Sequence, residues 1–198
     1  MRKKRSLGAD QFSKILQQDV IRSKERMDSD PSEAHRREFV RTTYSAIEAQ
    51  YWQLKMYLIE HIVTNKKEAF HEVAALKEES YVVSEKGEVH IKSKGYPLKT
   101  GLRLVVSILQ KYKIPIQVNL GSVDWKNLDG ALKIRNRVIH PKSMEDITVS
   151  IEEAECCYQA FAYINNLMLV AILGSALAVL NEGPVRNKRS SFFSLKEK

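Results

Sequence analysis

The sequence offers little support for disulfide or metal chemistry. Only two cysteines occur in 198 residues, and they are the neighbours Cys156 and Cys157. Adjacent cysteines in a helical pattern are poor candidates for a structural bridge, so we expect a protein of a reducing, cytoplasmic compartment. None of the five histidines falls in an HExxH arrangement, and no metal motif uses the cysteines. The sequence therefore predicts no metal ion and no other cofactor.

Signals for export are also lacking. The basic start MRKKRSLGAD is not followed by an apolar stretch, so no secretory signal is expected. The largely apolar run from Ala160 to Leu180 is the one segment that suggests a membrane anchor. Its two asparagines and its amphipathic lead-in from Ser150 favour a buried or dimer-facing helix instead. We therefore predict no membrane contact, and a membrane-tethered helical protein remains an alternative.

What is present is the composition of a soluble globular protein with a basic charge. Hydrophobic residues make up 43% of the chain and charged residues 28%, which suits one sizeable core. Thirty-two Lys and Arg against 24 Asp and Glu give a net charge of +8. This balance favours an anionic partner, most commonly nucleic acid, and the alternative is a charge that serves solubility alone.

Apolar periodicity predicts helices over most of the chain. Helical patterns run from Pro31 past Ile62, over 66–79, from Pro97 to before Ile114, through 122–141, and from Ser150 to about Val179. Residues 81–94 change to an alternating pattern around a turn, which predicts a short hairpin, and 143–149 is expected to be a loop. The fold class predicted is all-α: an antiparallel helical bundle over 31–180 with a small β-hairpin insert. Residues 1–30 are predicted to be a basic, partly ordered extension, and 181–198 a flexible basic tail.

The most informative stretch is SVDWKNLDGALKIRNRVIHP, from Ser122 to Pro141. Arg135 falls in the middle of its apolar face, and a guanidinium there is costly unless it is paired or lines a cleft. Glu48, at the edge of the first long helix, is the candidate structural partner, and the alternative is that Glu48 is solvated. The apolar face itself is formed by Trp125, Leu128, Leu132 and Ile139.

Two further polar groups lie near the end of this predicted helix. Pro141 biases the residue before it away from helical dihedral angles, so His140 should lie at the last turn. Asn136 lies four residues earlier and therefore shares the side of the helix that carries His140. A basic charge, an amide and an imidazole are thus expected to cluster near one helix end.

The segment RNRVIH resembles the motif of HEPN domains, in which a histidine follows an arginine after four to six residues. Many of those domains have asparagine directly after the arginine, as Asn136 follows Arg135 here. The resemblance covers roughly residues 31–180. It implies a helical bundle that forms a homodimer, and a metal-independent endoribonuclease that acts as a toxin or antiviral effector on RNA.

The resemblance also implies a role for each motif residue. Arg135 would stabilise the phosphate, His140 would transfer protons, and Asn136 would orient the group or the scissile phosphate. The residue types suit this chemistry, because arginine offers a planar charged fork and histidine titrates near neutral pH. The nearby cations Lys133, Arg137 and Lys142 are candidates for holding the RNA backbone, and the alternative is an exposed basic helix face.

One position departs from the pattern of some HEPN toxins. These toxins carry a tyrosine two residues after the histidine, which a partner nucleotidyltransferase modifies, whereas this chain has Lys142 there. A different antitoxin or a sensor protein is then the expected partner. The alternative function is a non-catalytic HEPN-like module that binds RNA or protein, in which Arg135 pairs structurally with an acid such as Glu48.

Overall fold

The computed structural model describes residues 4–65, 69–114, 116 and 118–181. In these residues the chain forms seven helices and one antiparallel hairpin, so the prediction of an all-α fold with a small hairpin is confirmed. The helices are α1 (Lys4–Ser29), α2 (Glu33–Asn65), α3 (Phe70–Leu76), α4 (Leu98–Lys111), α5 (Val123–Ile139), α6 (Met144–Ile147) and α7 (Ile151–Asn181), and the strands are β1 (Glu79–Val83) and β2 (Val89–Ser93). The predicted tail at 181–198 lies outside the described residues from 182 onward.

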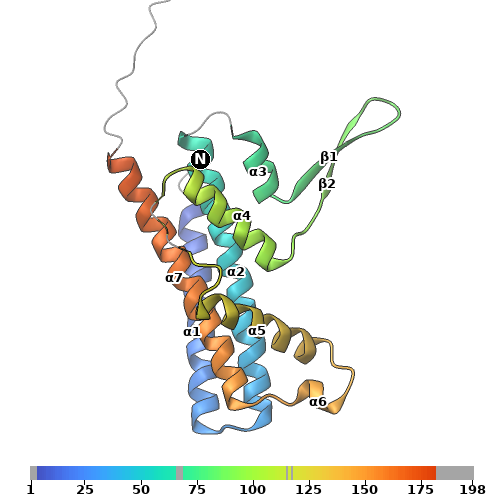
Figure 1. Ribbon diagram of the computed structural model, residues 1–198, viewed down its shortest axis with the longest axis vertical. Coiled ribbons are helices and arrows are strands. Elements are labelled where there is room, and N and C mark those ends of the chain that lie inside the picture. The colour runs from blue at the N-terminus through green and yellow to red at the C-terminus, as the bar shows by residue number, and fades with distance from the viewer. Residues whose placement is uncertain (1–3, 66–68, 115, 117, 182–198) are drawn as a thin grey trace, which may run out of the picture.

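The centre of the bundle is α2, which contacts α1, α3, α4, α5 and α7. Its 33 residues place apolar side chains at steps of three and four, so one face is buried along the whole helix. Figure 1 shows α1 and α2 side by side as a hairpin of helices, with α7 and α5 packed against them and the β-hairpin projecting away from the bundle. The fully buried positions of α2 include Phe39, Ile47, Leu54, Leu58 and Ile62.

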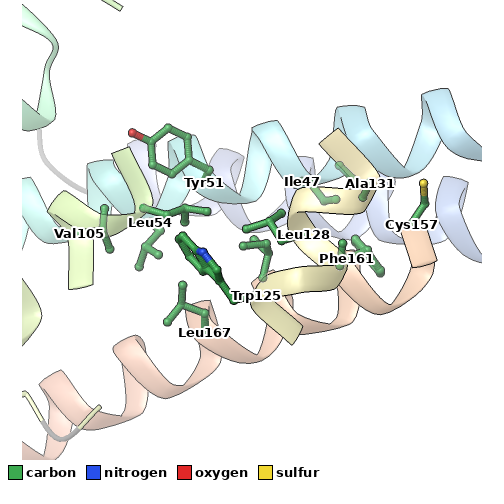
Figure 2. Close-up of a cluster of buried hydrophobic side chains, with 14 of the residues drawn as sticks. Ile47, Tyr51, Leu54, Val105, Trp125, Leu128, Ala131, Cys157, Phe161 and Leu167 are labelled. Carbon is green, nitrogen blue, oxygen red and sulfur yellow. The ribbon is translucent and has the colours of Figure 1, made fainter. Parts of the chain in front are cut away.

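The core between α2, α5 and α7 is drawn in Figure 2. The Trp125 indole of α5 lies between Leu54 of α2, Val105 of α4 and Leu167 of α7. Leu128 follows one turn later on α5 and is fully buried. These contacts hold α5 across the middle of the bundle and leave its C-terminal end at the surface.

The N-terminal segment differs from the prediction of a partly ordered extension. Residues Lys4–Ser29 form a continuous helix that packs along α2. Val20 and Met27 are buried in the core, and Arg26 Nη2 lies 2.6 Å from Glu38 Oε1 on α2. Only one side of α1 packs on the bundle, so Phe12 and Ile15 stay exposed.

The loop predicted at 143–149 also contains more structure than expected. Met144–Ile147 form the short helix α6, which begins with a capping box between Ser143 and Asp146. A second capping box begins α7: Ser150 N donates to Glu153 Oε2 at 3.0 Å, and Glu153 N donates to Ser150 Oγ at 3.2 Å. Both caps fix the direction of the chain after the motif helix.

Within the part of the chain that the structure describes, one helical segment is long and apolar enough by composition to cross a membrane, Ile151–Gly174 of α7. The bundle buries 33% of its most apolar stretch. Asn165, which interrupts this apolar run, accepts hydrogen bonds from Gln17 of α1 at 2.8 Å and from Gln50 of α2 at 3.0 Å. The asparagine that weakens the membrane pattern is therefore satisfied inside the bundle.

The two cysteines give a test of the packing between α5 and α7. Burial raises the pKa of the Cys157 thiol to about 12 and also raises the pKa of the Cys156 thiol, whose Sγ lies 3.3 Å from Asn127 O on α5. Because the thiolate is the reactive form, we expect iodoacetamide at pH 8 to leave Cys157 unmodified in the folded protein and to label it after denaturation. Peptide mass spectrometry measures this, and rapid labelling of native Cys157 would contradict the packing described here.

Candidate functional site

The helix that carries the motif begins at a well-formed cap. Ser122 Oγ accepts a hydrogen bond of 3.2 Å from Trp125 N, which satisfies one free N–H group of the first turn. The helix then turns one side to the core, formed by Trp125, Leu128, Ala131, Ile134 and Val138. Leu132 and Ile139, predicted on this side, are half-buried and exposed respectively, because they lie where α5 leaves its neighbours.

Arg135 is half-buried on the side of α5 that faces α2. Its Cζ lies 4.4 Å from the centre of the Tyr44 ring, a cation–π contact, and its Nη2 lies 3.7 Å from Glu48 Oε1. Tyr44 and Glu48 are one turn apart on α2, so the two side chains hold the guanidinium from one helix. Arg135 Nε is buried without a hydrogen-bond partner among the described residues.

Tyr44 serves as a stacking surface and not as a proton donor or acceptor at neutral pH. Burial raises the pKa of its phenol, and the negative charge of Glu48 raises it further, while Arg135 opposes both effects. The hydroxyl therefore stays protonated at neutral pH. Sequence reasoning did not identify Tyr44, although an aromatic residue one turn before a predicted acidic partner was a usable signal.

Asn136 connects the arginine to the end of the helix. Its Oδ1 accepts a hydrogen bond of 3.0 Å from Arg135 Nη1. Its backbone oxygen accepts a hydrogen bond of 3.0 Å from the backbone N–H of His140. The side chain of Asn136 is exposed, so a ligand at this surface can reach an amide and a guanidinium that already touch each other.

His140 is the residue that ends α5. Its φ of −122° and ψ of 59° are not helical, as expected before Pro141, and its side chain is exposed. His140 therefore lies at the surface, at the C-terminal end of the helix. Arg135, Asn136 and His140 thus all belong to the last two turns of α5.

The three predicted RNA-binding cations have different surroundings. Lys133 is 78% exposed and lies 3.4 Å from Asp129 Oδ2, and Lys142 is also exposed. Arg137 instead donates to the carbonyl oxygens of Glu145 at 3.0 Å and Asp146 at 3.3 Å. Its other contacts are Thr148 O and the Glu153 carboxylate. Arg137 is thus occupied in fixing the segment after the motif, a role that the sequence did not suggest.

Other arginines help to hold the same segment. Arg37 of α2 donates to Ile147 O at 3.1 Å, and Arg36 Nε donates to Val149 O. Together with Arg137, they bind the backbone carbonyls that precede α7. The chain that follows His140 is therefore attached to α2 by Arg36 and Arg37 and to α5 by Arg137.

Replacing Arg137 with alanine should destabilise the protein by about 2 kcal/mol, because several carbonyl acceptors and a partly buried carboxylate lose their donor. The matched control is Lys133→Ala, on the same helix, which removes an exposed cation and should change stability by less than about 0.5 kcal/mol. Urea unfolding followed by circular dichroism measures both. Equal effects for the two variants would show that Arg137 does not hold this segment.

Among the described residues no group of three or more His, Cys, Asp or Glu side chains could hold a metal ion. Comparison with protein-family models, with curated proteins and with solved structures finds no match for this chain. The structure itself defines an all-α bundle with a small β-hairpin. An arginine, an amide and an imidazole lie at the C-terminal end of one of its helices.

Proposed function

We propose that this protein is a metal-independent endoribonuclease of the HEPN type, acting as a toxin or an antiviral effector in the cytoplasm. The observation that carries the proposal is the exposed His140 at the end of α5, five residues after Arg135, whose guanidinium is held by Tyr44, Glu48 and Asn136. One residue can transfer protons near neutral pH, and the other keeps a charged fork for phosphate oxygens.

The reaction requires three contributions from the protein. A base removes the proton of the RNA 2′-hydroxyl, a cation stabilises the phosphorane that forms, and an acid protonates the leaving 5′-oxygen. The bond broken is the one from phosphorus to the 5′-oxygen, and the product is a 2′,3′-cyclic phosphate. One chain supplies one imidazole, so we propose that two chains share a cleft and supply the base and the acid.

An apolar surface beside the site supports such a dimer. Trp52, one turn after Glu48 on the outer side of α2, is 50% exposed, and Ile139 of α5 is also exposed. Together with the half-buried Leu132, each of these residues is one helical turn away from Arg135 or Glu48 along its helix. Covering this surface with a second copy buries apolar area and brings the two motif helices together.

The proposed RNA contacts use the two cations whose side chains are exposed. Lys133 and Lys142 are exposed on either side of Asn136 in the sequence, and the chain has a net charge of +8. Each phosphate contact contributes electrostatic affinity that falls with salt. Because Arg137 is occupied by backbone carbonyls, we leave it out of the proposed RNA surface.

A second candidate function is a non-catalytic module that binds RNA or protein. The observation that favours it is the pair of contacts that Arg135 makes with Tyr44 and Glu48, since these contacts alone account for an arginine on a core-facing side. In a binding module, His140 would be an exposed residue at a helix end with no catalytic role. Cleavage activity separates the two candidates.

The test incubates the purified full chain with total RNA in the presence of EDTA. We expect fragments with 2′,3′-cyclic phosphate ends, identified by their resistance to ligation until the cyclic phosphate is removed. Cleavage that stops with EDTA would contradict a metal-independent reaction. Intact RNA over the full range of pH and protein concentration would contradict the nuclease proposal and favour the binding module.

A further inference from the structure

The β-hairpin has one apolar face that is largely exposed, and the Phe70 ring of α3 contacts it only at Tyr81. Strand partners Tyr81 and Ile91 lie on this face, and so do Val83 and Val89, because alternate residues of a strand share a side. All four are exposed, with Ile91 at 63%. A two-stranded hairpin is marginally stable by itself, so an exposed apolar face of this kind points to a partner.

The hairpin is nevertheless held firmly at its base. Lys55, a buried lysine of α2, pairs with Glu78 directly before β1, and its ammonium lies 4.6 Å from the centre of the Tyr51 ring. Glu78 has a φ of 58°, a left-handed turn that directs the chain away from the bundle. The hairpin is thus presented to solvent in a defined direction, as Figure 1 shows.

The register decides which backbone groups are available on each edge. Ser84 N donates to Glu88 O at 2.9 Å, and Lys94 N donates to Glu78 O at 2.7 Å. In an antiparallel pair bonded residues alternate with non-bonded ones, so the even-numbered residues of β2 point their N–H and C=O groups toward β1. Val89, Ile91 and Ser93 therefore point theirs to the outer edge of β2.

The outer edge of β2 is the more open of the two edges. β1 lies beside α3, where the Phe70 ring is 5.7 Å from the Tyr81 ring, and the first residues of β1 are half-buried. Every residue of β2 is exposed. An edge of this kind is a ready template for another strand.

We propose that β2 pairs with β2 of a second copy of this chain, antiparallel and centred on Ile91. This register matches the outward backbone groups, since Ile91 meets its own symmetry mate and Val89 meets Ser93 of the partner subunit. It also makes one four-stranded sheet, whose apolar face is continuous across the two-fold axis.

Charge identifies a second copy as the occupant. The register places Glu88 opposite Lys94 of the partner subunit, and the symmetry repeats this pair. Residues 79–94 contain three glutamates and three lysines, whereas the whole chain carries +8. The hairpin is therefore a neutral, self-complementary segment at which two strongly basic chains meet without mutual repulsion.

The first experiment is disulfide trapping in the full chain. Ile91→Cys should form a covalent dimer under mild oxidation, because the two sulfurs face each other across the axis. Val82→Cys is the matched control: it lies on β1, is exposed, and is not at the axis, so it should stay monomeric on a denaturing gel. No trapping of Ile91→Cys, or equal trapping of both variants, would overturn the proposal.

The second experiment is a charge reversal followed by analytical ultracentrifugation. Glu88→Lys should weaken self-association at least tenfold, and Glu88→Lys with Lys94→Glu should restore it. If the double variant does not recover self-association while both proteins are folded, the proposed pairing is contradicted.

The same variants separate the hairpin contact from the proposed nuclease dimer, because the substituted residues are distant in sequence from His140. If RNA cleavage is unchanged while the molecular mass halves, the hairpin contact is separate from the proposed nuclease dimer.

Discussion

His140→Ala is expected to lower the rate of RNA cleavage by about 10³-fold, within the range known for loss of a general acid or base. The imidazole is exposed and ends α5, so its removal leaves the core untouched. The melting temperature should therefore stay within about 2 °C of wild type. Cleavage of a fluorescently labelled RNA under single-turnover conditions, with EDTA present, measures the rate.

The matched control for this experiment is His90→Ala. His90 is an exposed histidine of β2 that is distant in sequence from the motif, so its replacement should leave the cleavage rate unchanged. Arg135→Lys adds a second comparison, because it keeps the positive charge and loses the planar fork. A wild-type cleavage rate in His140→Ala would show that the imidazole takes no part in the reaction. Equal losses of cleavage rate in both histidine variants would indicate a structural effect.

Leu128→Ala is expected to destabilise the protein by about 3 kcal/mol, which lowers the melting temperature of a chain of this size by about 6 to 12 °C. Leu128 is fully buried between α5 and its neighbours, and alanine leaves a cavity that close packing does not fill. The result matters for function because this contact holds the motif helix against the bundle.

The same substitution on α7 provides the control for Leu128→Ala. Leu173 is 55% exposed, so Leu173→Ala removes the same atoms from the surface and should cost less than about 1 kcal/mol. Calorimetry of both variants measures the difference. A large loss of stability in Leu173→Ala and a small one in Leu128→Ala would contradict the packing of α5 and α7 described above.

Much of this fold follows from local patterns in the sequence. Ser122 and the Ser150–Glu153 pair predicted where two helices begin, and Pro141 predicted where the motif helix ends. These signals are local, because a cap or a proline acts on the backbone beside it. The alternating pattern likewise predicted the hairpin, whose turn contains Gly87 with a φ of 79°.

What local patterns do not specify is which neighbours a side chain meets. Trp52 of α2 is a large apolar residue, yet it is 50% exposed. Arg137 was predicted to bind RNA and is bonded to carbonyls eight to eleven residues further along the chain. The exposure of Trp52 and the contacts of Arg137 depend on how the helices pack in space, which neither charge nor periodicity encodes.

The central claim is that two subunits contribute Arg135 and His140 to one cleft, and a mixed dimer tests it most directly. Arg135→Ala and His140→Ala chains with different affinity tags can be co-expressed, and heterodimers purified over both tags. Each homodimer should be inactive. The heterodimer should cleave faster than either homodimer but more slowly than wild type, because its shared cleft keeps one arginine and one of the two histidines. A heterodimer as inactive as either parent, with wild-type folding and mass, would contradict a site built from two chains.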